Sequence, residues 1–200
     1  MFGISASVIL GIILGLFFKN ETFLSKSNLI VDIGLCLLLF FVGIDIGKNS
    51  NFFVNLNSFG KKIWLLPFST LIGTLLGGAI SSFFINMKMT ETILISSGLG
   101  WYSLSAIEIS KVDPRLGSLA FLSNVFREVL AIILIPYISK KLGGFESISA
   151  AGAPAMDTVL PIISKFNTPD IAVASFFSGV ILTGAVPIIV PLLISLFNIG

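Results

Sequence analysis

The chain has 200 residues, of which 55% are hydrophobic and 11% are charged, and its formal net charge is +2. A water-soluble domain carries roughly a quarter charged residues, so this composition excludes one. Histidine is absent and Cys36 is the single cysteine, which excludes His/Cys zinc sites, Cys–His pairs and Ser–His triads. No basic block typical of nucleic-acid binding occurs. We therefore expect an all-α, polytopic transmembrane bundle with no enzymatic activity, no bound metal and no cofactor.

The N-terminal third contains two apolar segments, 3–18 and 29–47. No Lys or Arg precedes the first segment and no small-residue cleavage site follows it, so we expect a retained span and not a secretory signal. The second segment contains Asp32 and Asp45 near its ends, where a carboxylate can reach the membrane interface. A third predicted span covers 63–86, close to the length of about 20 residues that a bilayer requires.

The segment 91–110 is interrupted by the run SSGLGWYSLS at residues 96–105. Irregular backbone survives at membrane depth only where protein or a water-filled cavity satisfies it. The run therefore indicates either a broken helix or small residues that allow close helix packing. Beside a break, Gly100, Trp101, Tyr102 and Ser103 would line a cavity; at a membrane surface the two aromatic residues would belong to an interfacial belt.

The segment 116–138 carries Arg127 and Glu128 at its centre. With a rise of about 1.5 Å per residue, each helix end lies about 16 Å away, so neither side chain can reach the interface and both must face protein or water. Asn124 lies one turn before Glu128 on the same face. These residues form either a structural salt bridge, for example between Arg127 and Asp157, or a functional site around the carboxylate.

The segment 147–164 contains the run AGAPAMDT at residues 151–158. Short spans interrupted by Gly and Pro point to the binding sites of transporters, so Gly152 and Pro154 are expected to line a cavity. The alternative is that the small residues only allow close helix packing. Asp157 is expected in the first turn of the half-helix that follows the break. There it either caps the helix or binds a cation.

The last predicted span covers 170–198 and contains Pro187 and Pro191, so it is long enough to tilt or kink. If all seven segments cross, the basic residues divide almost evenly between the two sides. The positive-inside rule therefore gives no orientation.

Three ordered motifs resemble the bacterial lysine exporter family, LysO: GWYSLS from Gly100, FLSNVFREVLAIILIP from Phe121 and GAPAMDTVLP from Gly152. The run LLFFVGIDIG at residues 38–47 is also similar, and the resemblance covers about residues 30–198. It implies export of L-lysine and its toxic analogues across the inner membrane, with dependence on membrane-embedded carboxylates. Glu128 matches one of these carboxylates, and Asp45 is a candidate repeat counterpart. Relatives that extend further at the N-terminus imply either a separate N-terminal subunit or self-assembly.

The leading hypothesis is a multi-pass secondary transporter for lysine or a similar cationic amino acid. Glu128 and Asp157 would hold an ammonium group or exchange it for a proton, while Arg127 or a half-helix N-terminus would hold the carboxylate. Two alternatives stay open: an Na⁺ or H⁺ antiporter without an organic substrate, and a non-transporting scaffold subunit whose buried charges all pair with one another.

Overall fold

The computed structural model describes residues 62–199, Gly60 and a few isolated helical positions before residue 45. It divides into two compact units, Met1–Ile44 and Asp45–Gly200. Apart from those isolated positions, the predicted spans 3–18 and 29–47 lie outside the part that can be described, as does the candidate site residue Asp45. The fold below is that of residues 62–199.

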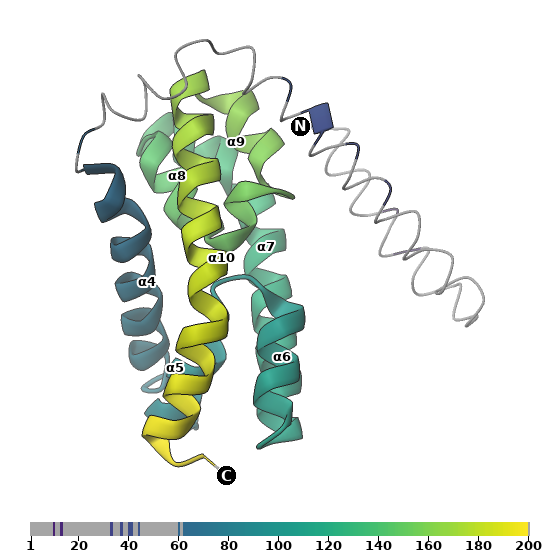
Figure 1. Ribbon diagram of the computed structural model, residues 1–200, viewed down its shortest axis with the longest axis vertical. Helices are drawn as coiled ribbons and strands as arrows, with labels where there is room; N and C mark the ends of the chain where they lie inside the picture. The colour runs from purple at the N-terminus through teal and green to yellow at the C-terminus, as the bar shows by residue number, and fades with distance from the viewer. Residues whose placement is uncertain are drawn as a thin grey trace. The chain divides into compact units, whose positions relative to one another are not determined.

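All regular structure in this part is helical (Figure 1). Three helices are long and apolar enough to cross a membrane: α4 (Lys62–Ser81), α7 (Pro114–Lys141) and α10 (Pro169–Phe197). The shorter elements between them are α5 (Met89–Ser96), α6 (Tyr102–Ser110), α8 (Gly144–Ala151), the 3₁₀ helix η1 (Ala153–Met156) and α9 (Leu160–Phe166). The expected interruptions of 91–110 and 147–164 are thus present, and the fold is the predicted all-α class.

The start of α7 follows from its sequence. Asp113 is the N-cap, and its carboxylate accepts hydrogen bonds from the backbone N–H groups of Arg115 (2.8 Å) and Leu116 (3.2 Å). Pro114 occupies the first helical position, where its missing N–H costs nothing. Lys140 and Lys141 lie in the last turn, where positive charge is favourable for the helix dipole.

Each interrupted segment reverses direction at its break instead of continuing across the bundle. Figure 1 shows α5 and α6 in the lower half and α8 and α9 in the upper half. Asn167, just after α9, donates hydrogen bonds to Ser139 near the end of α7 (3.0 Å) and to Ser147 near the start of α8 (3.5 Å). The second hairpin therefore ends where it began. We call α5–α6 the first hairpin and α8–η1–α9 the second hairpin.

Two pairs of helix starts are separated by the same number of residues. First-hairpin helix α5 and second-hairpin helix α8 begin at Met89 and Gly144, 55 positions apart (144 − 89). Helices α7 and α10 begin at Pro114 and Pro169, again 55 apart (169 − 114). Because the two hairpins enter from opposite ends, the units α4–α7 and α7–α10 are inverted repeats that share α7. Inverted repeats of this kind are common in secondary transporters.

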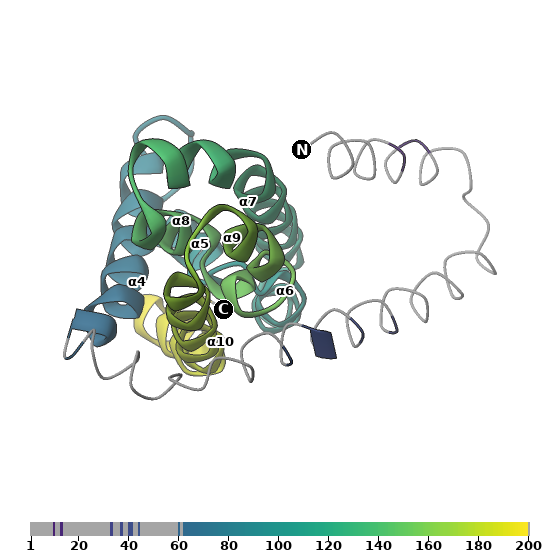
Figure 2. The same cartoon turned by 90° about the horizontal axis from the view of Figure 1, so that it is seen from above.

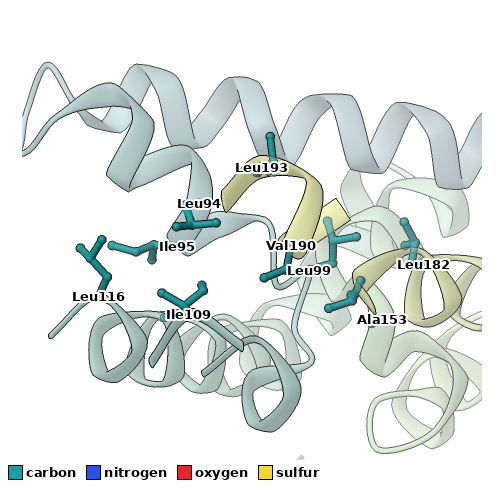
Figure 3. Packing of buried hydrophobic residues seen from close by; sticks show 11 residues of the cluster. Leu94, Ile95, Leu99, Ile109, Leu116, Ala153, Leu182, Val190 and Leu193 are labelled. Carbon is teal, nitrogen blue, oxygen red and sulfur yellow. The ribbon is translucent and has the colours of Figure 1, made fainter. Parts of the chain in front are cut away.

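Buried apolar side chains join the hairpins to the long helices. Viewed along the long axis, α5 and α9 lie between α4, α7 and α10 (Figure 2). One buried cluster extends from the lower end of the bundle, around Ile109 and Leu116, to Leu99 and Ala153 at its middle (Figure 3). Val190 and Leu182 of α10 belong to the same cluster, so the hairpin breaks are held in a packed core.

Candidate functional site

The two hairpin tips touch each other. The backbone N–H of Ala153 donates a 2.9 Å hydrogen bond to the carbonyl of Leu99, and Figure 3 shows these residues side by side. Gly100 lies against the ring of Pro154, whose Cδ would be 2.5 Å from a β-carbon placed on the glycine. The sequence elements GLG and GAP thus contact each other. Their hydrogen bond satisfies a backbone acceptor of the first break and a backbone donor of the second.

Positive backbone angles make both reversals possible. Gly100 has φ +104° and Gly152 has φ +74°, conformations that L side chains rarely adopt. Leu99 also has a positive φ, +53°, and its side chain is fully buried. A non-glycine residue in this conformation indicates local strain that the surrounding packing holds in place.

Asn124 of α7 holds the first tip. Its Oδ1 accepts a hydrogen bond from Gly100 N–H (2.8 Å), and its Nδ2 donates to the carbonyls of Ile95 (3.2 Å) and Ala120 (2.8 Å). The side chain is buried, and these three contacts use most of its hydrogen-bonding capacity. Asn124 therefore replaces backbone hydrogen bonds that α5 and α6 lose at the break.

Arg127, less than one turn further along α7, lies at the second tip. Its guanidinium donates to the carbonyl of Ser149 near the C-terminus of α8 (3.4 Å) and packs against Gly152. Within residues 62–199, Lys111 and Glu108 form an ion pair (2.6 Å), whereas no salt bridge joins Arg127 to Asp157 or Glu128. The proposed structural pair Arg127–Asp157 is therefore not formed.

Glu128 points toward the other arm of the second hairpin. Its carboxylate lies near the Thr158 side chain and near Asp157. The phenol of Tyr102, the first residue of α6, lies within range of both carboxylates. We call Tyr102, Glu128, Asp157 and Thr158 the carboxylate cluster. It gathers residues from both hairpins and from α7, and Glu128 and Asp157 are only partly buried.

Asp157 lies before helix α9, and not in its first turn as expected. It follows the 3₁₀ turn and precedes α9, whose N-cap is Val159 and whose first residue is Leu160. Its Oδ1 accepts hydrogen bonds from the N–H (2.6 Å) and hydroxyl (3.3 Å) of Thr158. The carboxylate is thus fixed in the irregular connection, not in the first turn of a half-helix, because the 3₁₀ turn delays the start of α9.

The residues expected to line a cavity divide between the tips and their surroundings. Gly100, Gly152 and Pro154 are buried where the tips meet, and Trp101 packs against the core. Tyr102 is 36% exposed and its ring meets Phe121 edge-on, with centroids 5.4 Å apart. Ser103 is exposed beside it. The tips therefore have a packed side containing Trp101 and a partly open side containing Tyr102.

Thr158 is the cluster member that sequence reasoning missed. The 55-residue spacing pairs Tyr102–Ser103 with Asp157–Thr158 and would have identified the position. No group of three or more His, Cys, Asp and Glu side chains suited to a metal ion occurs among the described residues.

Comparison with known proteins identifies the relatives of this helical core. The family model described as "Lysine exporter LysO" matches residues 5–194, nearly the whole chain. The chain belongs to the LysO family. The match begins further toward the N-terminus than the expected resemblance over residues 30–198, so the first two apolar segments are part of the family pattern.

Two curated LysO-family relatives have different lengths. A Haemophilus influenzae protein named "Putative lysine exporter" is 34% identical over 195 residues, which cover 96% of this chain and 95% of that protein. The "Lysine exporter LysO" of Escherichia coli K12 is 30% identical over 192 residues, covering 96% of this chain but 62% of that protein. No solved structure matches the chain.

Proposed function

We propose that the chain exports L-lysine or a related cationic amino acid across the bacterial inner membrane, in exchange for protons or another cation. The observation that carries this proposal is the carboxylate cluster. Glu128 lies at the centre of a helix long enough to cross a membrane, and no base within 62–199 forms a salt bridge with it or with Asp157. Unpaired carboxylates at that depth are costly unless they serve a cation or a proton.

The cluster fits an ammonium group. Two carboxylates and a threonine hydroxyl provide acceptors for the three N–H donors of an ammonium ion. The exposed phenol of Tyr102 adds an acceptor and an aromatic face that can contact a cation. Release of the ammonium would leave two neighbouring carboxylates, and proton uptake would relieve their mutual repulsion. Alternate occupancy by substrate and proton is the basis of exchange.

The test is Glu128→Gln in proteoliposomes that contain the purified protein and radiolabelled lysine. Loss of one charged contact should slow lysine efflux by about 10- to 100-fold, since hydrogen bonds to charged groups contribute about 1.5–3 kcal/mol. Asp157→Asn keeps an acceptor for Thr158 and should act in the same direction. Glu108→Gln is the matched control, because Glu108 pairs with the exposed Lys111. Efflux from Glu128→Gln equal to that from the wild type would refute the assignment.

An ion antiporter is the second candidate, because paired carboxylates without a base also suit Na⁺ or H⁺. Lysine flux and sodium-dependent pH change, measured in the same vesicles, separate the two. The longer E. coli relative supports a further proposal, that this chain works as a homo-oligomer or with a separate N-terminal subunit. Lysine efflux from vesicles containing this chain alone would rule out the need for a separate subunit.

A further inference from the structure

A second binding feature lies beside the carboxylate cluster, on the α8 side of α7. A groove of about 540 Å³ opens between α7 and α8. Its lining consists of Ser123, Phe126, Arg127, Leu130, Ala131, Leu134, Ile138 and Ala150. Arg127 is the single charged residue in this lining.

The guanidinium of Arg127 has unused hydrogen-bonding capacity. A guanidinium has five N–H donors, and the one acceptor recorded for it within residues 62–199 is the Ser149 carbonyl at 3.4 Å. No carboxylate of this part lies within salt-bridge distance of it. A cation in an apolar groove without an anion is costly, so the groove favours a ligand that brings a carboxylate.

The groove and the carboxylate cluster flank the same hairpin tip. Arg127 contacts Gly152 where the tip begins, and Glu128 lies near Thr158 after the tip ends. The two side chains leave α7 about 100° apart, so each addresses its own side of the tip. A cationic amino acid carries its carboxylate and its terminal ammonium at opposite ends of an apolar stem, and Leu130, Ala131 and Ala150 provide apolar walls for that stem.

We propose that Arg127 and the α7–α8 groove form a carboxylate subsite that makes the transporter select amino acids over the corresponding diamines. This inference rests on the proposed function and assigns the substrate's carboxylate end to a specific place. Loss of the subsite should affect lysine but not cadaverine, which is lysine without its carboxylate.

The experiment measures how strongly unlabelled lysine and cadaverine each inhibit radiolabelled lysine efflux from proteoliposomes. Wild-type protein should prefer lysine over cadaverine at least tenfold, as expected for one charge-assisted carboxylate contact. Arg127→Gln should bring the ratio of inhibition by lysine to inhibition by cadaverine close to one, mainly because lysine inhibits less strongly. Ala150→Leu narrows the groove without removing the guanidinium and should lower the ratio in the same direction. Leu122→Ala, at an exposed position of α7 outside the groove, is the control.

Three outcomes are informative. A wild-type protein that moves no lysine, whether alone or together with a separate N-terminal subunit, contradicts the proposed function itself. An unchanged ratio in Arg127→Gln, with normal lysine transport, overturns the subsite. Equal weakening of lysine and cadaverine in both Arg127→Gln and Ala150→Leu also overturns it, because it would show that Arg127 only positions the second tip.

Discussion

Replacing Gly152 by alanine tests the contact between the hairpin tips. A β-carbon at this position would lie 2.5 Å from the carbonyl oxygen of Leu99 and 2.7 Å from a guanidinium nitrogen of Arg127. Leu99 cannot retreat freely, because the same oxygen accepts the hydrogen bond from Ala153. The φ of +74° adds a backbone penalty of about 1–2 kcal/mol for an L-residue. Overpacking adds about 1–3 kcal/mol.

Together these terms predict that Gly152→Ala lowers the free energy of unfolding by about 2–5 kcal/mol. For a chain of this size the melting temperature should fall by roughly 4–20 °C. The assay is thermal unfolding in detergent, followed by circular dichroism and by size-exclusion chromatography of the heated sample.

Gly73→Ala is the matched control, because a β-carbon on this α4 glycine meets no described atom within 4 Å. Alanine favours a helix by up to about 1 kcal/mol over glycine, so the control should melt at or slightly above the wild-type temperature. The reasoning fails if Gly152→Ala melts within about a degree of the wild type, or if both variants lose stability equally.

Two further predictions concern polar groups of α7 and α10. Asn124→Ala leaves Gly100 N–H without its acceptor and should lower the free energy of unfolding by about 2–4 kcal/mol. The control Ser123→Ala, at an exposed neighbouring position, should change it little. Equal melting temperatures of the two variants would contradict the role of Asn124. Ser178 is buried, and its hydroxyl has no hydrogen-bond partner among the described residues, so Ser178→Ala should be neutral or stabilise by about 1 kcal/mol. Ser175→Ala loses a 2.7 Å hydrogen bond to the Ala155 carbonyl and should destabilise by about 1 kcal/mol; the opposite order of the two serine variants would refute this pair.

The sequence predicted the helical class, the two breaks and the central position of Arg127 and Glu128. The clustering of Gly98, Gly100, Gly152 and Pro154 favoured a break in each segment, although close helix packing stayed open as the alternative. The depth of the charged pair followed from helix rise alone. Neighbouring helical residues point about 100° apart, which explains why Arg127 and Glu128 contact different arms of the second hairpin.

The reversal of each hairpin was not visible in the sequence. Two helical arms of eight and nine residues joined by a break have the same length and composition as one interrupted span. The direction of the second arm depends on tertiary contacts, such as those of Asn167 with Ser139 and Ser147. The Arg127–Asp157 pair was a plausible guess from charge, but the guanidinium faces the α8 arm and the carboxylate lies beyond the tip.

The repeat was present in the sequence but weak. At the 55-residue spacing, Pro114, Phe121 and Ser123 have identical counterparts in Pro169, Phe176 and Ser178. Asn124 corresponds to Gly179, and each of them contacts the break that precedes its own helix. The two units preserve the packing role while the residue types differ.

Sharing one helix between the two units has a mechanical consequence. Asn124 of α7 is hydrogen-bonded to the first tip and Arg127 to the second hairpin. The two residues are three positions apart, which corresponds to about 4.5 Å along the helix axis. A rotation or translation of α7 therefore cannot change the contacts of Asn124 without also changing those of Arg127. The contacts at both hairpin tips therefore depend on the same short stretch of α7, and a displacement of that stretch would alter both.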